Sequence, residues 1–270
     1  MIYHYTSISS LVQILENKNL KFNNLTRCDD LDEAVSADLG RVGRYVFVSS
    51  WTRESEESIP MWSQYSGNMS GVRIGMREYP FKRRRYNNIG SEGAFDTYLD
   101  FDKYYNENKM AFAANQPQLF DVEYTEDDIK IYPNILSEGQ EGDLDRLIHG
   151  QPSKVTLSFE SVGKYKRTCW AFQRECRYKI FGTPIGLQDM NGIDEKTFLA
   201  RQSETYRRMT DETYIPEYQA LFVDLDDKAI QNMEIVFGPR MDESEKILLR
   251  NYLETKGLSN NYKDSTLMIQ

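Results

Sequence analysis

Short apolar runs rich in β-branched and aromatic residues recur through the first third of the chain. Four of them predict strands: Ile2–Tyr5, Leu20–Phe22, Tyr45–Trp51 and Gly71–Met76. The run at Tyr45–Trp51 is the clearest, because it is almost continuously apolar and ends in small polar residues. Strands buried on both faces have this pattern.

Segments whose apolar residues have helical spacing lie between these runs. Apolar residues recur at helical intervals from Ile8 to Leu15, and Ser7 or Ser9 stands where a helix cap is needed. Pro60 predicts the first turn of a second, short helix, because proline is tolerated at that position. This second helix carries two aromatic residues, Trp62 and Tyr65.

The rest of the chain mixes both patterns without a regular alternation of strand and helix. Strands are predicted at Leu119–Tyr124, Cys176–Phe181, Tyr218–Val223 and Met233–Phe237. Helices are predicted at Val155–Arg167, Asp194–Met209 and Glu243–Leu253. Irregular mixing favours an α+β fold over a doubly wound sheet. We expect residues 1–270 to form a single domain with a polar insertion around residues 78–118.

Composition and charge exclude some classes of function. The chain has 40% hydrophobic residues, as soluble globular proteins do, and a formal net charge of −9. That charge argues against a protein that coats nucleic acid through phosphate contacts. The basic run at residues 82–85 is interpreted as a solvated strand end or loop, with an anionic partner as the alternative.

The three cysteines, Cys28, Cys169 and Cys176, predict no disulfide framework and a reducing compartment. Two histidines, His4 and His149, provide no spacing typical of a zinc site, so no metal is expected. The sequence shows neither a signal peptide nor an apolar run long enough to span a membrane. A cytoplasmic protein without a membrane partner is therefore expected.

Motifs for nucleotide binding and hydrolysis are missing. No Gly-x-Gly-x-x-Gly follows a strand, and no phosphate-binding loop is present. Three distant segments carry candidate chemistry instead: residues 3–6 (Tyr-His-Tyr-Thr), 61–65 (Met-Trp-Ser-Gln-Tyr) and 170–177 (Trp-Ala-Phe-Gln-Arg-Glu-Cys-Arg). Together they supply a histidine, an aromatic residue flanked by polar residues, and a glutamate two places after a glutamine.

In this order, and with residues 45–50 (Tyr-Val-Phe-Val-Ser-Ser), 71–75 (Gly-Val-Arg-Ile-Gly) and 233–239 (Met-Glu-Ile-Val-Phe-Gly-Pro), these segments resemble a large, uncharacterised bacterial family. It is a domain of unknown function often found near defence and mobile elements. That family is in turn distantly similar to the ADP-ribosyltransferases. The resemblance implies an ADP-ribosyltransferase-like fold, with split mixed and antiparallel β-sheets and flanking helices. It also implies NAD as a substrate and a role in phage defence or as a toxin.

The resemblance assigns roles to particular residues. His4 and Thr6, with Tyr5 between them, match the motif that holds the ribose of NAD. Tyr65 is the residue expected to stack on the nicotinamide, and Glu175 is expected to stabilise the cation that forms as nicotinamide departs. Further residues expected to line the pocket are Ser49, Ser50, Trp62 and Arg73.

Gln173 resembles the residue with which some ADP-ribosyltransferases engage the acceptor. Many members of the uncharacterised family carry glutamate at this place, so the acceptor, a protein or a nucleic acid, is not assigned. The expected activity is transfer of ADP-ribose to a macromolecule or hydrolysis of NAD. The alternative is a catalytically silent module on the same scaffold that binds a nucleotide or a protein.

Each candidate also has a purely structural interpretation. His4 is alternatively a core histidine with a satisfied hydrogen bond, and Trp62 and Tyr65 are alternatively packing residues. Glu175 precedes Arg177 by two residues, so the two lie on one face of a strand and can form a structural ion pair. A structure separates these interpretations by showing whether His4, Tyr65 and Glu175 line one pocket.

Overall fold

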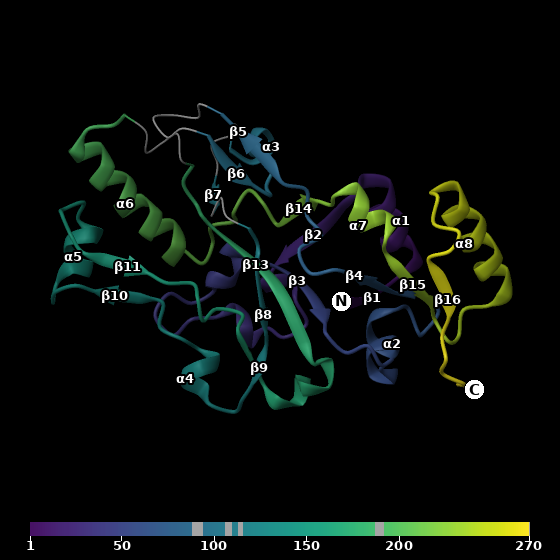
Figure 1. Cartoon of the computed structure of the whole chain (residues 1–270). Coiled ribbons are helices and arrows are strands. Elements are labelled where there is room, and N and C mark those ends of the chain that lie inside the picture. The colour runs from purple at the N-terminus through teal and green to yellow at the C-terminus, as the bar shows by residue number, and fades with distance from the viewer. Residues whose placement is uncertain (88–93, 106–109, 113–115, 187–191, 270) are drawn as a thin grey trace.

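The computed structural model describes residues 1–87, 94–105, 110–112, 116–186 and 192–269 (Figure 1). Ten of the strands in these ranges form one sheet. Seven follow the order β14-β2-β3-β1-β4-β15-β16, and their bounds are β14 Ala220–Asp224, β2 Asn19–Asn24, β3 Val46–Thr52, β1 Ile2–Thr6, β4 Val72–Met76, β15 Glu234–Phe237 and β16 Tyr262–Asp264. The other three lie beyond β3: β13 (Glu175–Thr183), which pairs with β3, and β7 (Ala111–Phe112) and β8 (Gln118–Asp121), which pair with β13.

In the described ranges, three pairs of short strands lie outside this sheet. They are β5 (Arg84–Tyr86) with β6 (Phe95–Thr97), β9 (Glu123–Tyr124) with β12 (Tyr165–Lys166), and β10 (Leu136–Glu138) with β11 (Val155–Leu157). The α-helices are α1 (Ile8–Asn17), α2 (Ile59–Tyr65), α3 (Phe101–Tyr105), α4 (Asp128–Ile131), α5 (Asp143–Ile148), α6 (Glu195–Thr210), α7 (Asp227–Gln231) and α8 (Glu243–Thr255). Short 3₁₀ helices are η1 (Leu25–Arg27), η2 (Asp32–Ala34), η3 (Val42–Tyr45) and η4 (Thr168–Gln173).

The pairs β15–β16 and β9–β12 are parallel, whereas the other strand pairs of the described residues are antiparallel. The sheet is open, and helices flank it on several sides (Figure 1). The α+β class with mixed and antiparallel sheets, predicted from the sequence, is therefore confirmed.

The large sheet divides at β3. On one side β3 pairs along its length with β13. On the other side it pairs with β2 at Phe47 and Val48, and with β1 at its last residue, Thr52. In the pairings of the described chain, Ser49–Trp51 thus have a neighbouring strand on one side alone. The strands β1 and β2 diverge at this point and leave a gap beside β3.

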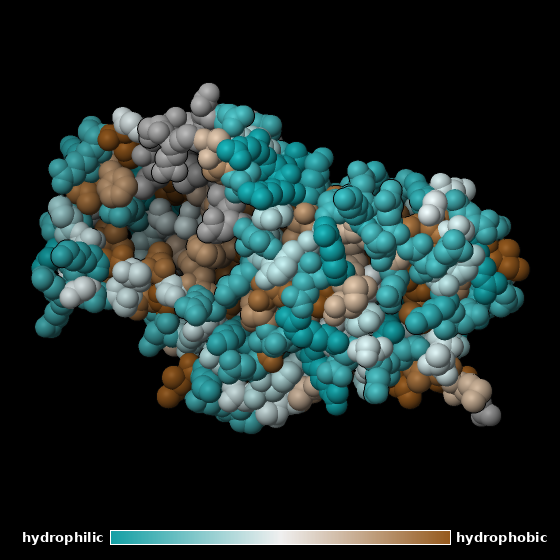
Figure 2. All heavy atoms as spheres, viewed as in Figure 1, coloured by the Kyte–Doolittle hydropathy of each residue, from teal (hydrophilic) through white to brown (hydrophobic). Residues whose placement is uncertain are grey.

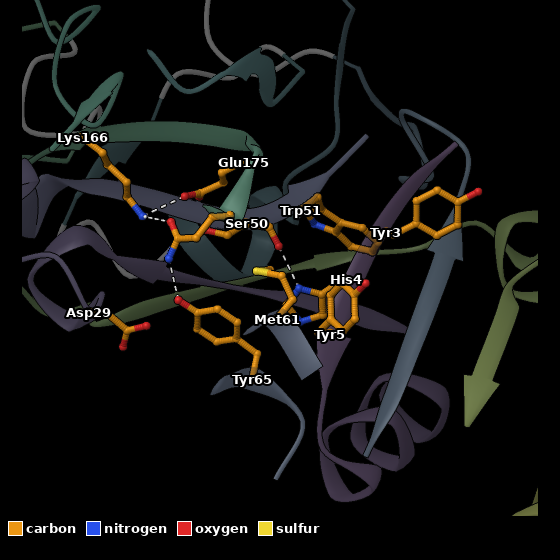
Figure 3. A pocket seen from close by; sticks show the side chains of 11 residues that line it. Tyr3, His4, Tyr5, Asp29, Ser50, Trp51, Met61, Tyr65, Lys166 and Glu175 are labelled. Atoms are coloured by element: carbon orange, nitrogen blue, oxygen red, sulfur yellow. Dashed lines mark hydrogen bonds and ion pairs between the residues drawn. The ribbon is translucent and has the colours of Figure 1, made fainter. Parts of the chain in front are cut away.

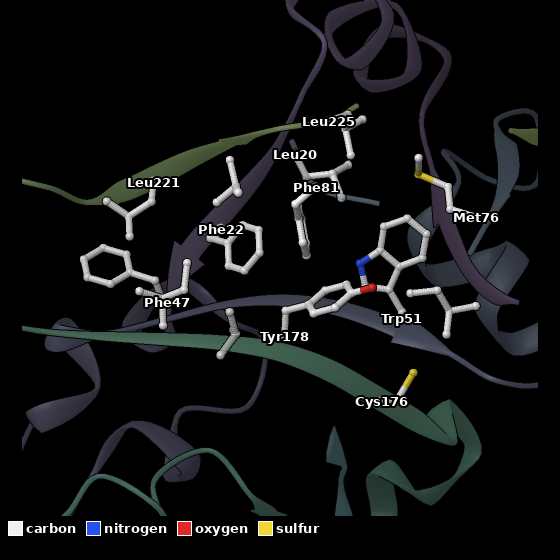
Figure 4. Packing of buried hydrophobic residues seen from close by; sticks show 14 of the residues in the cluster. Leu20, Phe22, Phe47, Trp51, Met76, Phe81, Cys176, Tyr178, Leu221 and Leu225 are labelled. Carbon is white, nitrogen blue, oxygen red and sulfur yellow. The ribbon is translucent and has the colours of Figure 1, made fainter. Parts of the chain in front are cut away.

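Alternate residues of β13 point to opposite faces, as the pleat of a strand requires. Tyr178 enters the main core, where its ring centroid lies 4.8 Å from that of Phe81 (Figure 4). Glu175, Arg177 and Lys179 lie on the other face, yet all three are buried. This second face of β13 is therefore a buried polar layer rather than a surface.

Capping residues explain where the helices α1 and α8 begin and where α8 ends. The Ser7 side chain accepts a hydrogen bond from the Ser10 amide at the start of α1 (3.1 Å), so one of the two expected caps is used. Asp242 and Glu245 form a capping box at the start of α8. Gly257 follows α8 with a φ of +75°, the left-handed conformation that glycine adopts without strain.

Several sequence predictions are wrong in detail. Residues 155–167 were expected to be helical but contain the strands β11 and β12, because the apolar spacing here comes from short strands and turns. The expected strand Leu119–Tyr124 is divided into β8 and β9, which pair with different partners. All three cysteines are free: Cys176 is buried, Cys28 is partly buried and Cys169 is exposed.

The expected polar insertion around residues 78–118 contains β5, β6, α3 and β7, and parts of it lie outside the described residues. Its basic run is neutralised locally. Arg83 pairs with Asp96, and Arg84 pairs with Asp224 and with Asp100 (3.2 Å for the last). The run therefore behaves as a solvated strand end, as interpreted from the sequence.

Hydrophilic side chains cover most of the face seen in Figure 2. Hydrophobic residues gather there in a hollow beside α5 and α6. No described helix is long and apolar enough to cross a membrane.

Candidate functional site

A pocket opens where β1, β3, α2 and the start of β13 meet (Figure 3). Its empty volume, counted with the solvent at its mouth, is about 470 Å³. The residues that line it come from all three segments singled out in the sequence, and also from β3, β12 and the loop before η2: Tyr3, His4, Tyr5, Asp29, Ser50, Trp51, Met61, Tyr65, Lys166, Gln173 and Glu175.

His4 lies where the sheet divides. Its Nδ1 donates a hydrogen bond of 2.7 Å to the carbonyl oxygen of Ser50, on the edge of β3 that lacks a neighbouring strand. The imidazole thus satisfies a backbone acceptor that strand pairing leaves unpaired. Burial lowers the pKa of His4, although the Ser50 carbonyl and the negative charge of Glu175 oppose this. The neutral ring therefore presents Nε2 as a hydrogen-bond acceptor.

Glu175, the first residue of β13, belongs to a buried cluster of four charges. Its Oε2 accepts from Lys166 Nζ at 2.8 Å, and its Oε1 accepts from Arg177 Nε at 2.7 Å. Arg177 also pairs with Glu33 of η2 at 2.6 Å, and Lys166 lies 3.8 Å from the same carboxylate. We call these four residues the charge cluster.

The charge cluster keeps Glu175 ionised. Burial by itself raises the pKa of the Glu175 carboxyl, but the positive charges of Arg177 and Lys166 outweigh that effect and hold the pKa at about 2. Burial raises the pKa of Glu33 despite the same two cations. Glu175 is thus the strongly acidic member of the cluster, and it is the carboxylate of the cluster that lines the pocket.

The ion pair between Glu175 and Arg177, the structural alternative considered for this residue, is therefore present. It does not remove Glu175 from the pocket wall, because Arg177 approaches from the buried side and is itself fully buried. Both interpretations hold for one residue: the carboxylate is paired and also faces the pocket.

Gln173 and Tyr65 form a link across the pocket (Figure 3). Gln173 Oε1 accepts a hydrogen bond from Lys166 Nζ at 2.9 Å, and Gln173 Nε2 donates to the Tyr65 hydroxyl at 2.5 Å. Burial raises the pKa of Tyr65, and the negative charge of Asp29 raises it further. Tyr65 therefore stays protonated at neutral pH.

The structure brings six of the predicted residues to the pocket, namely His4, Tyr5, Ser50, Tyr65, Gln173 and Glu175. Two others, Thr6 and Ser49, line an adjoining groove that begins on the far side of His4. This groove lies in the gap between β1 and β2 and is lined largely by polar residues of α1, β2 and β3. His4, Ser50 and Trp51 line both hollows.

Trp62 and Arg73 are not brought to the pocket. Trp62 is fully buried in a small second core, and its ring meets Tyr5 edge-on at 4.9 Å. Arg73 is also buried, donates to the Ser55 carbonyl at 2.9 Å and lies 4.6 Å from the centre of the Tyr3 ring. Trp62 is thus a packing residue, and among the described residues Arg73 pairs with aromatic rings rather than with a carboxylate.

Sequence reasoning missed Lys166 and Asp29. Lys166 lies in the segment expected to be helical, and Asp29 lies in an acidic loop without periodicity. Neither residue had a local pattern that distinguished it from surface charge. Trp51 and Met61 also line the pocket, and both lie inside segments that the sequence had already singled out.

The chemistry that these residues offer is that of a fixed anion beside hydrogen-bonding groups. A buried, ionised carboxylate can stabilise a positive charge that develops on a substrate. His4 Nε2 and the Tyr65 hydroxyl offer polar contacts on the opposite wall. Among the described residues there is no group of three or more His, Cys, Asp or Glu side chains that could hold a metal ion.

Residues 61–178 match the model of a family described as "Protein of unknown function (DUF2971)". The resemblance to a family of unknown function is confirmed over this stretch. The matched residues include Tyr65, Lys166, Gln173 and Glu175, whereas His4 and Ser50 precede them. Neither the curated proteins nor the solved structures contain a match to the chain.

Proposed function

We propose that this protein binds NAD and cleaves the bond between nicotinamide and ribose, so that ADP-ribose passes to a macromolecule or to water. The observation that carries the proposal is the position of Glu175. Its carboxylate is kept ionised by the charge cluster and lies in the wall of a pocket shared with His4 and Tyr65.

The chemistry of the bond explains why such a carboxylate matters. Loss of nicotinamide leaves a ribose with oxocarbenium character, as in glycoside hydrolysis. A fixed negative charge lowers the energy of that state more than it lowers the energy of the substrate. Because Glu175 begins a strand and is bonded to Lys166 and Arg177, the carboxylate needs little reorganisation during the reaction.

The groove beyond His4 supports a substrate longer than a nicotinamide riboside. Thr6 and Ser49 line this groove, and His4 and Ser50 line both hollows. A dinucleotide would then place nicotinamide near Tyr65 and extend past His4 into the gap between β1 and β2. In this arrangement Nε2 of His4 accepts a hydrogen bond from a ribose hydroxyl.

The first test compares two glutamates of the charge cluster. Glu175→Gln removes the carboxylate that faces the pocket, whereas Glu33→Gln removes one that does not line it. Purified protein should release nicotinamide from NAD, measured by chromatography. Glu175→Gln should lower this rate at least about 10²-fold, the size expected for loss of one electrostatic stabiliser.

Glu33→Gln is the matched control, because it removes the same charge from the same cluster and should retain most of the release. Circular dichroism and thermal melting show whether each variant is folded. Equal rates for wild-type protein and folded Glu175→Gln would contradict the proposed role of Glu175.

One observation favours the alternative, a catalytically silent module that binds a nucleotide. Both oxygens of Glu175 are bonded to cations, which compensates its charge. If NAD raises the melting temperature of the wild-type protein but no nicotinamide appears, the binding module is the correct function. If NAD neither binds nor reacts, both functions are wrong.

A further inference from the structure

Lys166 is buried, and its ammonium group lies at the inner end of the pocket (Figure 3). It donates to Gln173 Oε1 at 2.9 Å and to Glu175 Oε2 at 2.8 Å, and it lies 3.8 Å from Glu33 Oε1. Arg177, the other cation of the charge cluster, does not line the pocket. Lys166 is thus the cation that connects the charge cluster to the pocket.

The hydrogen-bonding capacity of lysine determines the direction of the link. An ammonium group has donors and no acceptor, so the group facing it on Gln173 has to be the amide oxygen. The amide NH₂ then faces Tyr65 and donates to its hydroxyl. The phenolic oxygen accepts this bond, and its own proton is free to point toward Asp29, whose negative charge acts on Tyr65.

Without Lys166 the direction of the Gln173 amide is specified from the Tyr65 end alone, because the two ends of the amide have almost the same shape. A reversed amide places its oxygen against Tyr65 and reverses the hydroxyl proton. Lys166 and Asp29 thus set the polarity of this pocket wall from its two ends, and Lys166 is the buried one.

The charge balance of the charge cluster also depends on Lys166. The charge cluster contains two carboxylates, Glu33 and Glu175, and two cations, Arg177 and Lys166. Removal of Lys166 leaves one excess negative charge in a buried site, where an unpaired charge is costly. The excess is relieved if a carboxyl group takes up a proton.

We propose that Lys166 is a positioning residue of the candidate site: its ammonium group orients the Gln173 amide toward Tyr65 and keeps the Glu175 carboxylate in its anionic, pocket-facing form. The role in turnover depends on the proposed function, whereas the effect on the carboxyl group does not. Lys166 does not itself react in this proposal.

The first experiment follows nicotinamide release against pH for wild-type protein, Lys166→Met and Lys164→Met. Lys164 is two residues away and pairs with Glu123 at the surface (3.1 Å), so its variant removes one positive charge without touching the pocket. Lys166→Met should lower kcat roughly 10²-fold and move the acid limb of the pH profile upward by about one unit or more. Lys164→Met should match the wild type.

A second experiment does not need activity. Protein with ¹³C-labelled glutamate carboxyl groups is titrated by NMR, and the Glu175 signal is assigned by its loss in Glu175→Gln. The charged groups that act on this carboxyl are Arg177, Lys166 and Glu33. The other titratable groups that interact with it are His4, Tyr65, Tyr124, Cys28 and Cys176. Lys166→Met removes one of the two cations, so the Glu175 midpoint should rise, while Lys164→Met should leave it unchanged.

A third variant keeps the test independent of the stability of Lys166→Met. Gln173→Leu has a similar volume and retains all four charges of the charge cluster, so it should fold. It should lower kcat without moving the acid limb, because the link to Tyr65 is broken but Glu175 keeps both cations. Retention of full kcat in Gln173→Leu would overturn the role of the link.

The outcomes separate the two proposals. If the wild-type protein releases no nicotinamide, the proposed function fails, and the NMR titration still decides the effect of Lys166. If Glu175 titrates at the same pH in wild type and folded Lys166→Met, or if Lys164→Met produces the same shift, Lys166 is not a positioning residue.

Discussion

At the scale of single residues, Arg174 determines how two pocket residues are presented. It joins Gln173, the last residue of η4, to Glu175, the first of β13, and adopts a left-handed conformation with φ +41° and ψ +52°. Its carbonyl oxygen accepts from Thr52 Oγ1 at 2.8 Å. This turn ends the 3₁₀ helix and starts the strand so that both neighbouring side chains line the pocket.

An arginine in this conformation is strained, because its Cβ crowds the backbone, whereas glycine has no Cβ. Arg174→Gly should therefore raise the free energy of unfolding by about 1 kcal/mol. Urea denaturation measures the change. Under the proposed function, the variant should also retain nicotinamide release, because the turn is preserved.

Arg174 also pairs with Glu54 at 3.1 Å in an exposed position. Glu54→Gln removes this ion pair with the backbone unchanged, and an exposed pair contributes under about 1 kcal/mol. If Arg174→Gly is less stable than Glu54→Gln, the turn is not strained.

At the scale of elements, the connection from α2 to β4 holds the Tyr65 helix against the first strand. Gly71 donates its amide to the Ser66 carbonyl at 2.6 Å. A Cβ on Gly71 would lie 2.3 Å from the Thr6 carbonyl oxygen, whereas one on Gly67 would meet nothing closer than 4.0 Å. The close approach of the Thr6 backbone therefore requires glycine at position 71, and the left-handed φ of +61° favours glycine at position 67.

The two glycines should respond differently to alanine. Gly67→Ala should cost about 1 kcal/mol of unfolding free energy, the strain of a left-handed alanine. Gly71→Ala should cost more, about 2–3 kcal/mol, because β1 and β4 have to separate to admit the new methyl group. Under the proposed function, Gly71→Ala should also weaken NAD binding, because Met61 and Tyr65 line the pocket and move with α2, and calorimetry measures both effects.

At the scale of the whole molecule, the charge cluster joins segments that are far apart in the chain. Glu33 comes from η2, Lys166 from β12, and Glu175 and Arg177 from β13. Together they lie on the buried polar face of β13, which Lys179 shares, and unpaired charges there would be costly. The stability of the fold should therefore depend on the ionisation of this cluster.

The two carboxyl groups should affect stability with opposite sign in acid. The folded pKa of Glu175, about 2, lies below its ordinary value of 4.5, so its contribution is complete above about pH 4.5 and disappears as pH falls toward 2. The folded pKa of Glu33 is raised, so its contribution is largest at low pH and decreases as pH rises past 4.5.

Urea denaturation from pH 3 to pH 7 tests this on Glu175→Gln and Glu33→Gln. The stability deficit of Glu175→Gln relative to wild type should shrink as the pH is lowered, whereas that of Glu33→Gln should grow. Parallel pH curves for the two variants would show that the two groups do not differ in the folded protein.

Most elements around the pocket were predictable because their patterns are local. The strand of His4, the helix of Tyr65 and the strand beginning at Glu175 have the expected spacing of apolar residues. The segment of Lys166 was predicted wrongly, because a strand of two residues is too short to show a period. Trp62 was expected in the pocket. Met61 and Tyr65, four residues apart, share the helix face that lines the pocket, whereas Trp62 follows Met61 directly and points inward to the second core.

The sequence by itself determined the α+β class and the three segments that carry the candidate chemistry, because apolar periodicity and residue type are local properties. Only the tertiary structure decided that His4, Tyr65 and Glu175 line one pocket and that Lys166 joins Glu175 to Gln173. Those relations depend on how β3 pairs with β1, β2 and β13. Pairing between distant strands follows from the packing of the whole chain, and no single stretch of residues records it.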